Sequence, residues 1–406
     1  MFNKISLYVI GVYSSKLEER TQVLIMKYRD VVEEVLRIMW PRPLKLFTAG
    51  PVACFPEVLE VMKAQMFSHR SVEYSELHRD TVKRLADFLE AKKSTVMLFP
   101  SSGTGIMEAS IRSAVSPGGK VLVTIIGAFG YRYRDVVEWN GRKAIVLEKK
   151  PGEPVLPEEL DEALKKNPDV EAVTITYNET STGVLNPLKE LAKVAKEHEK
   201  LVFVDAVSAM GAADIKVDDW GLDIVFASSQ KAFGVPPGLA MASFSEEVFE
   251  KAKKISDRGW YFDLLLYRKY LDKQWSTPST PPIPQIAGLN VALRIVEKMG
   301  GKYVWLKMYE NRAEKIRRGV LDLGLELFAK PGYYSPTITV VKTPPGIKGI
   351  DVYNEMRKRG IEIAKGYGPV KEYTFRIGHM GYITDEDINE LFKNLKEVIE
   401  YLKSKR

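Results

Sequence analysis

The chain has 406 residues, of which 45% are hydrophobic and 28% charged, and this ordinary globular composition excludes a disordered or collagen-like chain. Its net charge of +7 comes from 60 Lys and Arg against 53 Asp and Glu, and its short basic clusters alternate with acids, so no nucleic-acid-binding surface is indicated. The single cysteine, Cys54, excludes an internal disulfide framework, and the four histidines lack the spacing of a metal site, so we expect no metal and a reducing, cytoplasmic setting.

The first 43 residues are expected to form an N-terminal arm and a helix. The apolar run Ile5–Tyr13 faintly resembles the core of a signal peptide, but it is short and has no Ala-x-Ala cleavage site. An extra strand, an arm or a start codon assigned too early explains this run more simply. The pattern from Met26 to Met39 predicts an amphipathic helix, which Pro41 and Pro43 stop. No apolar run in the chain reaches the roughly 20 residues that a membrane-spanning helix needs.

From residue 44 onward, short apolar runs alternate with helical patterns. This alternation predicts a parallel sheet with helices on both of its faces. The expected strands are Val96–Phe99, Lys120–Thr124, Lys143–Leu147, Ala172–Tyr177, Leu201–Asp205, Ile224–Ala227 and Leu239–Ser243. The expected helices between them include Gly105–Ala114, Pro157–Lys166 and Pro187–Glu199.

The alternation of apolar runs and helical patterns ends after Phe244. Residues 246–274 are expected to be helical, and Ser276–Pro284 is a rigid, proline-rich loop that cannot be a helix or a central strand. The elements expected beyond it are a helix at Ile286–Met299, strands at Thr337–Lys342 and Phe375–Gly378, and helices at Ile350–Arg359 and Asp385–Ser404. We therefore expect a large domain over residues 44–300 and a smaller α+β domain over residues 301–406.

The turn Pro100–Gly105 links a predicted strand to a predicted helix. Backbone N–H groups at the start of a helix, next to small residues, form a site suited to a phosphate anion. A glycine- and serine-containing turn at such a place is, by itself, usually only a turn. The dinucleotide-binding pattern is absent because Glu108 stands where its third glycine belongs, and no Walker A lysine is present.

Three charged residues stand on or after predicted strands. Asp205 ends its strand at the carboxyl edge, where open α/β sheets place ligands, although a helix cap or turn is an equal alternative. Lys231 follows the next strand among small residues, where a lysine with a lowered pKa can be a Schiff-base nucleophile; an isolated lysine is more often solvated. The 26 residues between them match one passage from strand to strand. Arg376 suits bidentate carboxylate binding, with a structural salt bridge as the alternative.

The order of these features resembles that of the class V, fold-type I, pyridoxal-phosphate (PLP) aminotransferases, and is most similar to the alanine–glyoxylate and serine–pyruvate branch. The resemblance runs from about Leu46 to about Leu402. It also includes Thr48–Val52, His69–Ser71 with Glu108, Gly127–Gly130, Asn178–Gly183, Gln230–Ala232 and Pro236–Gly238. It implies an α/β fold with a large, mainly parallel α/β/α sandwich domain that binds PLP and a smaller C-terminal α+β domain.

The resemblance also implies roles for individual residues. Lys231 would carry PLP as a Schiff base, and Asp205 would pair with the pyridinium nitrogen so that the ring can act as an electron sink. These two are the expected catalytic residues. Phe129 would stack on the cofactor ring, Val207 would contact its other face, and Thr180 would contact its phenolic oxygen.

The remaining expected contacts concern the phosphate group, the substrate and a second subunit. The phosphate ligands implied by the resemblance are Ser102, Gly103, Thr104 and Gln230. Two residues of the proline-rich loop would reach the phosphate of a neighbouring subunit in a homodimer, namely Thr280 and, where relatives commonly carry a tyrosine, Thr277. Arg376 would hold the α-carboxylate of the substrate, and Gly50 would line the site.

These residues predict a ping-pong aminotransferase that moves an amino group from serine or alanine to pyruvate or glyoxylate. Phosphoserine as donor would need further cations, for which the candidates are Arg70, Arg79, Lys365 and His379. Aspartate or glutamate would need a second carboxylate-binding arginine. A cysteine desulfurase is disfavoured because Cys54 lies far upstream of the lysine. A non-catalytic subunit of the same fold, as in hydrogenase-associated relatives, is disfavoured because Lys231, Asp205 and Arg376 are all present.

Overall fold

The computed structural model describes residues 30–38 and 44–405, which belong to two separate units. One unit runs to Leu44, and the other comprises Lys45–Arg406. In the first unit, residues 30–38 form a helix whose side chains are exposed. This helix falls within the range predicted for residues 26–39, of which residues 26–29 and 39 lie outside the described part. The apolar run Ile5–Tyr13 also lies outside it.

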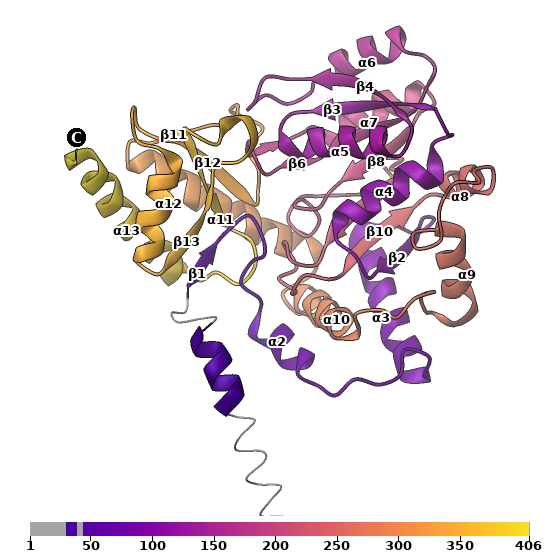
Figure 1. Ribbon diagram of the computed structural model, residues 1–406, viewed down its shortest axis with the longest axis horizontal. Coiled ribbons are helices and arrows are strands. Elements are labelled where there is room, and N and C mark those ends of the chain that lie inside the picture. Colours follow the sequence, from indigo (N-terminus) through magenta and orange to yellow (C-terminus); the bar gives the residue numbers. More distant parts are fainter. Residues whose placement is uncertain (1–29, 39–43, 406) are drawn as a thin grey trace, which may run out of the picture. The chain divides into compact units, whose positions relative to one another are not determined.

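The second unit contains a seven-stranded sheet in which one strand is antiparallel to the other six (Figure 1). In spatial order its strands are β2 (Thr95–Phe99), β10 (Ala240–Phe244), β9 (Ile224–Ser228), β8 (Leu201–Asp205), β5 (Val170–Thr176), β3 (Lys120–Ile125) and β4 (Lys143–Glu148). Strand β10 pairs antiparallel with both β2 and β9. The predicted α/β architecture with a mainly parallel sheet is therefore confirmed.

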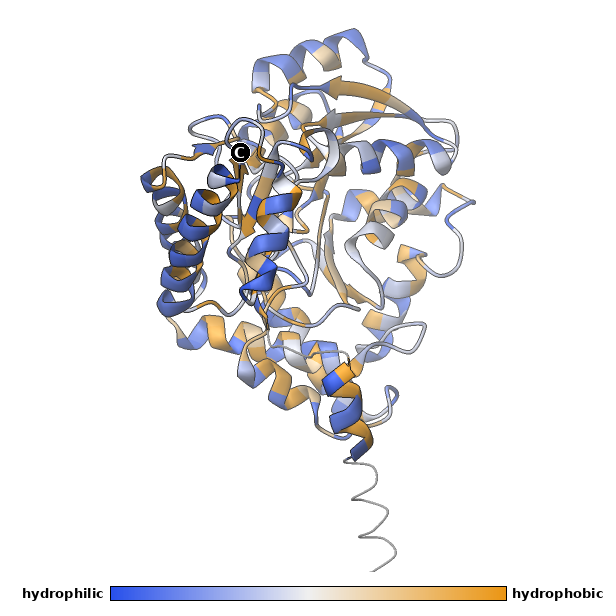
Figure 2. Ribbon diagram, turned by 60° about the vertical axis from the view of Figure 1, so that its left-hand side comes forward, coloured by the Kyte–Doolittle hydropathy of each residue, from blue (hydrophilic) through white to orange (hydrophobic). Residues whose placement is uncertain are grey.

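Helices cover both faces of this sheet because successive side chains of each strand point to opposite sides. Val202 and Val204 of β8 pack into one apolar core, while Leu201 and Phe203 pack into another. The helices over the first face are α3 (Val72–Leu89), α6 (Pro157–Lys166), α7 (Leu188–Glu197) and α10 (Ile283–Lys298). Those over the second are α4 (Gly103–Ala114), α5 (Ala128–Trp139), α8 (Glu246–Lys253) and α9 (Leu264–Gln274). The apolar strands and the mixed, outward-facing helices are visible in Figure 2.

A five-stranded sheet lies beside the large one (Figure 1). In spatial order it contains β1 (Lys45–Phe47), β13 (Ile361–Lys365), β14 (Thr374–Gly378), β12 (Ile338–Lys342) and β11 (Glu326–Leu327). A third core, which includes Phe47, Phe375 and Leu391, joins this sheet to its helices. The helices of this region are α11 (Lys302–Asp322), α12 (Gly349–Lys358), the 3-10 turn η1 (Gly368–Val370) and α13 (Asp385–Ser404). The remaining elements are helix α2 (Pro56–Met62) and the small hairpin of β6 (Asn178–Glu179) and β7 (Val184–Leu185).

Three details differ from the sequence-based expectations. Residues 246–274 are not one helix, because α8 ends at Lys253 and α9 begins at Leu264. The proline-rich segment ends earlier than expected, since α10 already begins at Ile283 and takes Pro284 into its first turn, where no N–H donor is needed. Strand β1 lies in the small sheet through parallel pairing with β13, although its residues were expected in the large domain. The division at residue 300 stays a prediction.

No helix within residues 30–38 and 44–405 combines the length and the hydropathy that crossing a membrane requires.

We expect Gly378→Ala to destabilise the small sheet. A Cβ atom at Gly378 would lie 1.8 Å from the carbonyl oxygen of Thr48, and its nearest neighbours are all backbone atoms of Thr48 and Ala49, so no flexible side chain can move away. The free energy of unfolding should fall by about 1–3 kcal/mol or more, measured by urea denaturation. Glu400→Ala, on the exposed face of α13, is the control and should change it by no more than about 0.5 kcal/mol. Equal midpoints for the two variants would contradict this account of the Gly378 contact.

Candidate active site

The predicted site residues converge because the parallel strands end at one edge of the large sheet. Asp205 is the last residue of β8, and Lys231 follows β9 by three residues. Helix α4 begins after β2 at Gly103, and Phe129 lies in the first turn of α5 after β3. Thr180 follows the end of β5 through the short strand β6.

The Lys231 amine lies against a segment that arrives from the small sheet. Its Nζ donates a hydrogen bond to the carbonyl oxygen of Ala49. The next residue is Gly50, with φ of 111°, and a Cβ atom there would lie 2.7 Å from Nζ. Burial, together with the nearby positive charge of Arg376, lowers the pKa of Lys231 to about 8. About a tenth of this amine is therefore neutral, and so nucleophilic, at pH 7.

Asp205 is buried with one carboxylate oxygen unpaired. Its Oδ1 accepts a hydrogen bond from the backbone N–H of Val207 at 2.9 Å, and no described residue donates to the other oxygen. Burial raises the pKa of Asp205 to about 7, and the buried Glu179 adds to the rise, while Lys231 and Arg132 oppose it. A cationic N–H donor placed at the free oxygen would stabilise the ionised carboxylate.

The turn at the start of α4 is held close to the sheet. The backbone N–H of Gly103 donates to the hydroxyl of Ser228 at 2.6 Å, and a Cβ atom at Gly103 would lie 2.4 Å from Cγ2 of Val207. Ser102 is the exposed N-cap residue and makes no side-chain cap hydrogen bond. The Thr104 hydroxyl accepts a hydrogen bond from Arg132 at 3.3 Å. Gln230 is half-buried.

Arg376 is held by backbone carbonyl groups rather than by a carboxylate. On β14, its Nε donates to the carbonyl oxygen of Lys365 at 2.7 Å and its Nη1 to that of Thr180 at 2.9 Å. The guanidinium carbon lies 5.5 Å from the ring centre of Tyr367. Burial lowers the pKa of Arg376 to about 10, so it remains a cation at neutral pH. Its other donors are available to a carboxylate.

Phe129 stands at the centre of a group that sequence reasoning largely missed. Its ring centroid is 6.0 Å from that of Tyr367, and the Arg132 guanidinium carbon lies 4.8 Å from the Phe129 ring centre. Its backbone N–H donates to the fully buried Glu179 carboxylate at 2.9 Å. Hydrogen bonds from the backbone and hydroxyl of Ser181, at 2.9 and 2.6 Å, hold that carboxylate. Burial raises the pKa of Glu179 above its usual range, and these bonds oppose the rise.

The signals for these missed residues were weak. Arg132 follows Phe129 at i+3, so a helix beginning at Ala128 would have placed both on one face. Glu179 was noted only as part of the segment Asn178–Gly183. Tyr367 has no local pattern, because it reaches Phe129 from a loop of the small sheet region.

The two threonines of the proline-rich loop do not contact the other predicted site residues within this chain. The Thr277 hydroxyl is buried and donates to the carbonyl oxygen of Ser279 at 2.7 Å. Arg70 fixes the loop through hydrogen bonds to the Ser276 hydroxyl and the Thr277 carbonyl oxygen, each at 2.9 Å. Thr280 is exposed.

The cations considered for phosphoserine do not form a ready phosphate site. Arg70 is occupied by the loop just described. His379 is buried between Thr339 and Pro336, and burial lowers its pKa to about 3, so it is neutral at physiological pH. Arg79 and Lys365 are both exposed.

Cys54 lies nearer to the lysine turn than its sequence position suggests. It belongs to the segment that follows Gly50, and a Cβ atom at Gly234 would lie 3.1 Å from Phe55. Burial raises the pKa of the Cys54 thiol, which disfavours the reactive thiolate.

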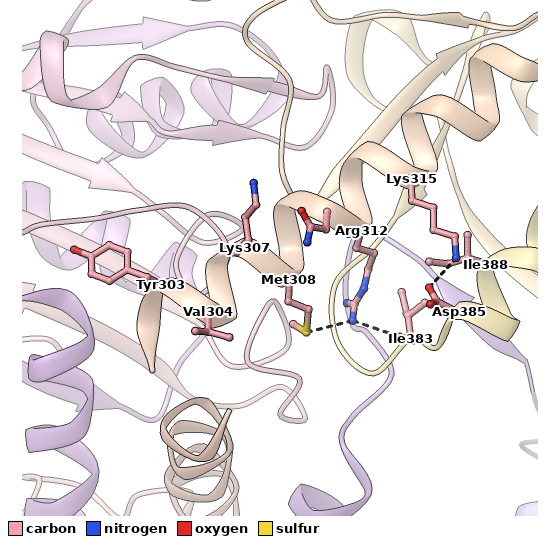
Figure 3. A pocket seen from close by; sticks show the side chains of 10 residues that line it. Tyr303, Val304, Lys307, Met308, Arg312, Lys315, Ile383, Asp385 and Ile388 are labelled. Atoms are coloured by element: carbon pink, nitrogen blue, oxygen red, sulfur yellow. Dashed lines mark hydrogen bonds and ion pairs between the residues drawn. The ribbon is translucent and has the colours of Figure 1, made fainter. Parts of the chain in front are cut away.

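A separate hollow of about 890 Å³ runs along α11 and the start of α13 (Figure 3). Its lining includes Tyr303, Met308 and Ile388, and no predicted site residue. Arg312 crosses it and donates to the carbonyl oxygens of His379, Gly381 and Ile383. These bonds hold the segment that follows Arg376 in the chain.

The donor set around Lys231 fits PLP. A primary amine with a lowered pKa matches the aldehyde, and the free oxygen of buried Asp205 matches a protonated pyridine nitrogen. The N-terminus of α4 favours a phosphate through its partial positive charge and the N–H of Thr104, whereas the N–H of Gly103 donates to Ser228. Within the described residues, no cluster of three or more His, Cys, Asp or Glu side chains could hold a metal ion.

Residues 46–391 match the family described as "Aminotransferase class-V". The chain is 34% identical to the soluble hydrogenase 42 kDa subunit of Anabaena cylindrica, covering 88% of this chain and 93% of the relative. It is 32% identical to the serine–glyoxylate aminotransferase of Methylorubrum extorquens, covering 85% of this chain and 87% of the relative. The crystal structure of an alanine–glyoxylate aminotransferase from Nostoc sp. superposes with a TM-score of 0.85 at 28% identity, covering 88% of this chain and 96% of that chain.

The lowered pKa of Lys231 predicts how PLP capture depends on pH. Only the neutral amine attacks an aldehyde, so the capture rate should rise with pH to a midpoint near 8 rather than 10.5. In Arg376→Gln, the loss of a nearby positive charge should move the midpoint upward. The rate is measured by stopped-flow absorbance on the PLP-free chain.

The control is Arg318→Gln, at an exposed arginine of α11 that pairs with Glu314, and it should leave the midpoint unchanged. A wild-type midpoint near the ordinary lysine value would show that the site does not lower the pKa of Lys231. An Arg376→Gln profile that matches wild type would show that the charge of Arg376 does not contribute to that pKa.

Proposed function

Because the chain belongs to the class V aminotransferases, a family of PLP-dependent transaminases, we propose that it transfers the amino group of a small amino acid, serine or alanine, to glyoxylate or pyruvate. The observation that carries this choice of donor is Arg376, whose guanidinium is fixed by two backbone carbonyls and keeps donors for one carboxylate. Glyoxylate is supported as acceptor by the names of the serine and alanine relatives. The composition, with one cysteine, supports a cytoplasmic location.

The residues divide the work between binding and proton transfer. Bound PLP supplies a conjugated ring that stabilises negative charge at the α-carbon of the amino acid. Arg376 holds the α-carboxylate, which fixes the orientation of the α-carbon bonds. Lys231 Nζ takes the α-proton as a general base and later returns it, and its lowered pKa suits this role at neutral pH. Asp205 holds a proton on the pyridine nitrogen through its free oxygen.

The same groups serve both halves of the reaction. The amino donor and the oxo-acid acceptor each carry an α-carboxylate, so Arg376 can bind them in turn at one place. Phe129 would support the cofactor ring, with Val207 on its other face and Thr180 near its phenolic oxygen. Ser102, Gly103, Thr104 and Gln230 would surround the phosphate. One site used twice predicts ping-pong kinetics.

Other donors and a non-catalytic role are less well supported. Phosphoserine lacks a free cation cluster, since Arg70 is engaged in its loop and His379 is neutral. Aspartate would need a second arginine on the substrate side, whereas Arg132 bonds to Thr104 at the turn assigned to phosphate. The relative named as a hydrogenase subunit raises the alternative of a retired enzyme. Lys231 and Asp205 argue against it, because both are buried with shifted pKa values, and buried ionisable groups destabilise a fold that does not use them.

We also propose a homodimer with a shared phosphate site. Thr280 is exposed in the single chain and Thr277 bonds within its own loop, so Thr280 is free to reach a neighbouring subunit. Arg70 holds this loop in place, which would keep Thr280 positioned for that contact.

A panel of half-reactions tests the activity and its donor. The PLP-loaded chain is mixed with single amino acids, and the loss of its visible absorption band is followed. Serine and alanine should convert the cofactor roughly tenfold or more faster than aspartate and phosphoserine, and glyoxylate should restore the band. Borohydride should reduce the imine, which bleaches the visible band and leaves the cofactor covalently attached to wild-type protein but not to Lys231→Ala.

Faster conversion by aspartate or phosphoserine would overturn the donor proposal. Absence of a reducible band in PLP-saturated wild-type protein would overturn the proposed activity and favour a non-catalytic subunit.

Sedimentation tests the shared site. The PLP-loaded chain should sediment as a dimer, because Thr280 is expected to complete the phosphate site of the other copy. Thr280→Ala should bind PLP more weakly, while Ser404→Ala, at an exposed position of α13, should bind it as wild type does. A monomer with full PLP affinity and full activity would contradict the proposal.

A further inference from the structure

Arg132 lies beside the turn assigned to phosphate but belongs to a different helix. It is the fifth residue of α5, and its half-buried guanidinium lies 4.8 Å from the ring centre of Phe129. Its Nη1 donates to the hydroxyl of Thr104, in the first turn of α4, at 3.3 Å. The ring and the hydroxyl thus hold the guanidinium at the edge of the predicted cofactor site.

Within the described residues, Arg132 has no carboxylate partner. The Thr104 bond uses one of its five N–H donors. Arg134, two residues further on the same helix, pairs with Asp135 at 2.7 Å. A half-buried cation without a counter-ion is costly, and here it points to an anion that the isolated chain does not contain.

The position of Thr104 identifies the class of anion. The first turn of α4 provides backbone N–H groups and the partial positive charge of a helix N-terminus, which favour phosphate. The other ligands expected from this chain, including Ser102, Gly103 and Gln230, are neutral. A phosphate dianion therefore needs a cation at this turn, and the planar guanidinium fork matches its oxygens.

We propose that Arg132 binds the phosphate group of PLP and supplies the positive charge that the α4 turn lacks. This inference rests on the proposed function, because it assumes that PLP reacts with Lys231. Phe129 would then contact two partners, with the Arg132 guanidinium packed against its ring and the cofactor stacked on it. Glu179, which binds the backbone N–H of Phe129, fixes the start of α5 and thereby the position of Arg132.

The competing role for Arg132 is recognition of a distal substrate carboxylate, as an aspartate donor would require. The two roles differ in the ligand whose binding they affect. A phosphate ligand discriminates PLP from pyridoxal, which has the same ring and aldehyde but no phosphate. A distal-carboxylate ligand discriminates aspartate from alanine and treats PLP and pyridoxal alike.

The experiment measures the dissociation constants of PLP and pyridoxal for the cofactor-free chain by absorbance and fluorescence titration. Arg132→Gln should weaken PLP by roughly 10- to 100-fold, as expected for losing a charged hydrogen-bonded partner. Pyridoxal binding should change by less than about threefold. Arg132→Lys should fall between wild type and Arg132→Gln, since it keeps the charge but loses the fork. Arg134→Gln is the matched control on the same helix and should resemble wild type.

A second measurement uses inorganic phosphate as a competitor. Phosphate should slow PLP capture by wild-type protein and should do so less in Arg132→Gln. Urea midpoints of all variants show whether the fold is intact.

Equal weakening of PLP and pyridoxal in folded Arg132→Gln would overturn the inference, as would unchanged PLP affinity with altered selectivity between aspartate and alanine. These failures are distinct from that of the proposed function, in which wild-type protein would not take up PLP at Lys231 at all.

Discussion

The buried carboxylate of Asp205 is the constraint around which the site is built. Its place at the end of a central strand removes it from water, and burial raises its pKa to about 7. The positive charges of Lys231 and Arg132 oppose this rise. Burial and the positive charge of Arg376 in turn lower the pKa of Lys231. Such a cluster of buried, partly compensated charges is unfavourable by itself, and a zwitterionic ligand with a pyridine nitrogen, an aldehyde and a phosphate would satisfy several of these groups together.

The parallel sheet makes this arrangement geometrically simple. Strands β2, β3, β5, β8 and β9 all end at the same edge, so short turns bring residues far apart in sequence to one edge of the sheet. Close packing at Gly103 against Val207 and Ser228 draws the α4 turn onto the strand ends. A side chain at Gly103 would push that turn away from Val207 and Ser228, and this explains why a residue without a side chain is needed there.

The sequence was sufficient for features with a local pattern. The apolar strands and the helix Asp385–Ser404 were predicted from periodicity, and the polar residues at strand ends followed from the strands. The roles given to Lys231, Asp205 and Arg376 came from family resemblance and stay predictions. What could not be predicted depends on pairing between distant segments. Strand β1 is only three residues long, and its partner β13 lies more than three hundred residues away. Arg132 and Tyr367 could not be assigned to the site from the sequence, because only their packing against Phe129 in the folded chain places them there.

The contacts of the site connect the two sheets, and this has a consequence for how it forms. Ala49 and Gly50, which follow strand β1, meet Lys231 of the large sheet, and Arg376 on β14 bonds to Thr180. Tyr367 lies against Phe129, while the neighbouring Gly368 approaches Ala128 so closely that a Cβ atom would be 3.1 Å away. The amine is therefore desolvated in part by residues that follow the small sheet, and the arginine is oriented by Lys365 of its own sheet and by Thr180 of the large-sheet region. Any loosening between the sheets would admit water to Lys231, return its pKa toward the ordinary value and release Arg376 together, so cofactor chemistry and substrate orientation depend on the same packing.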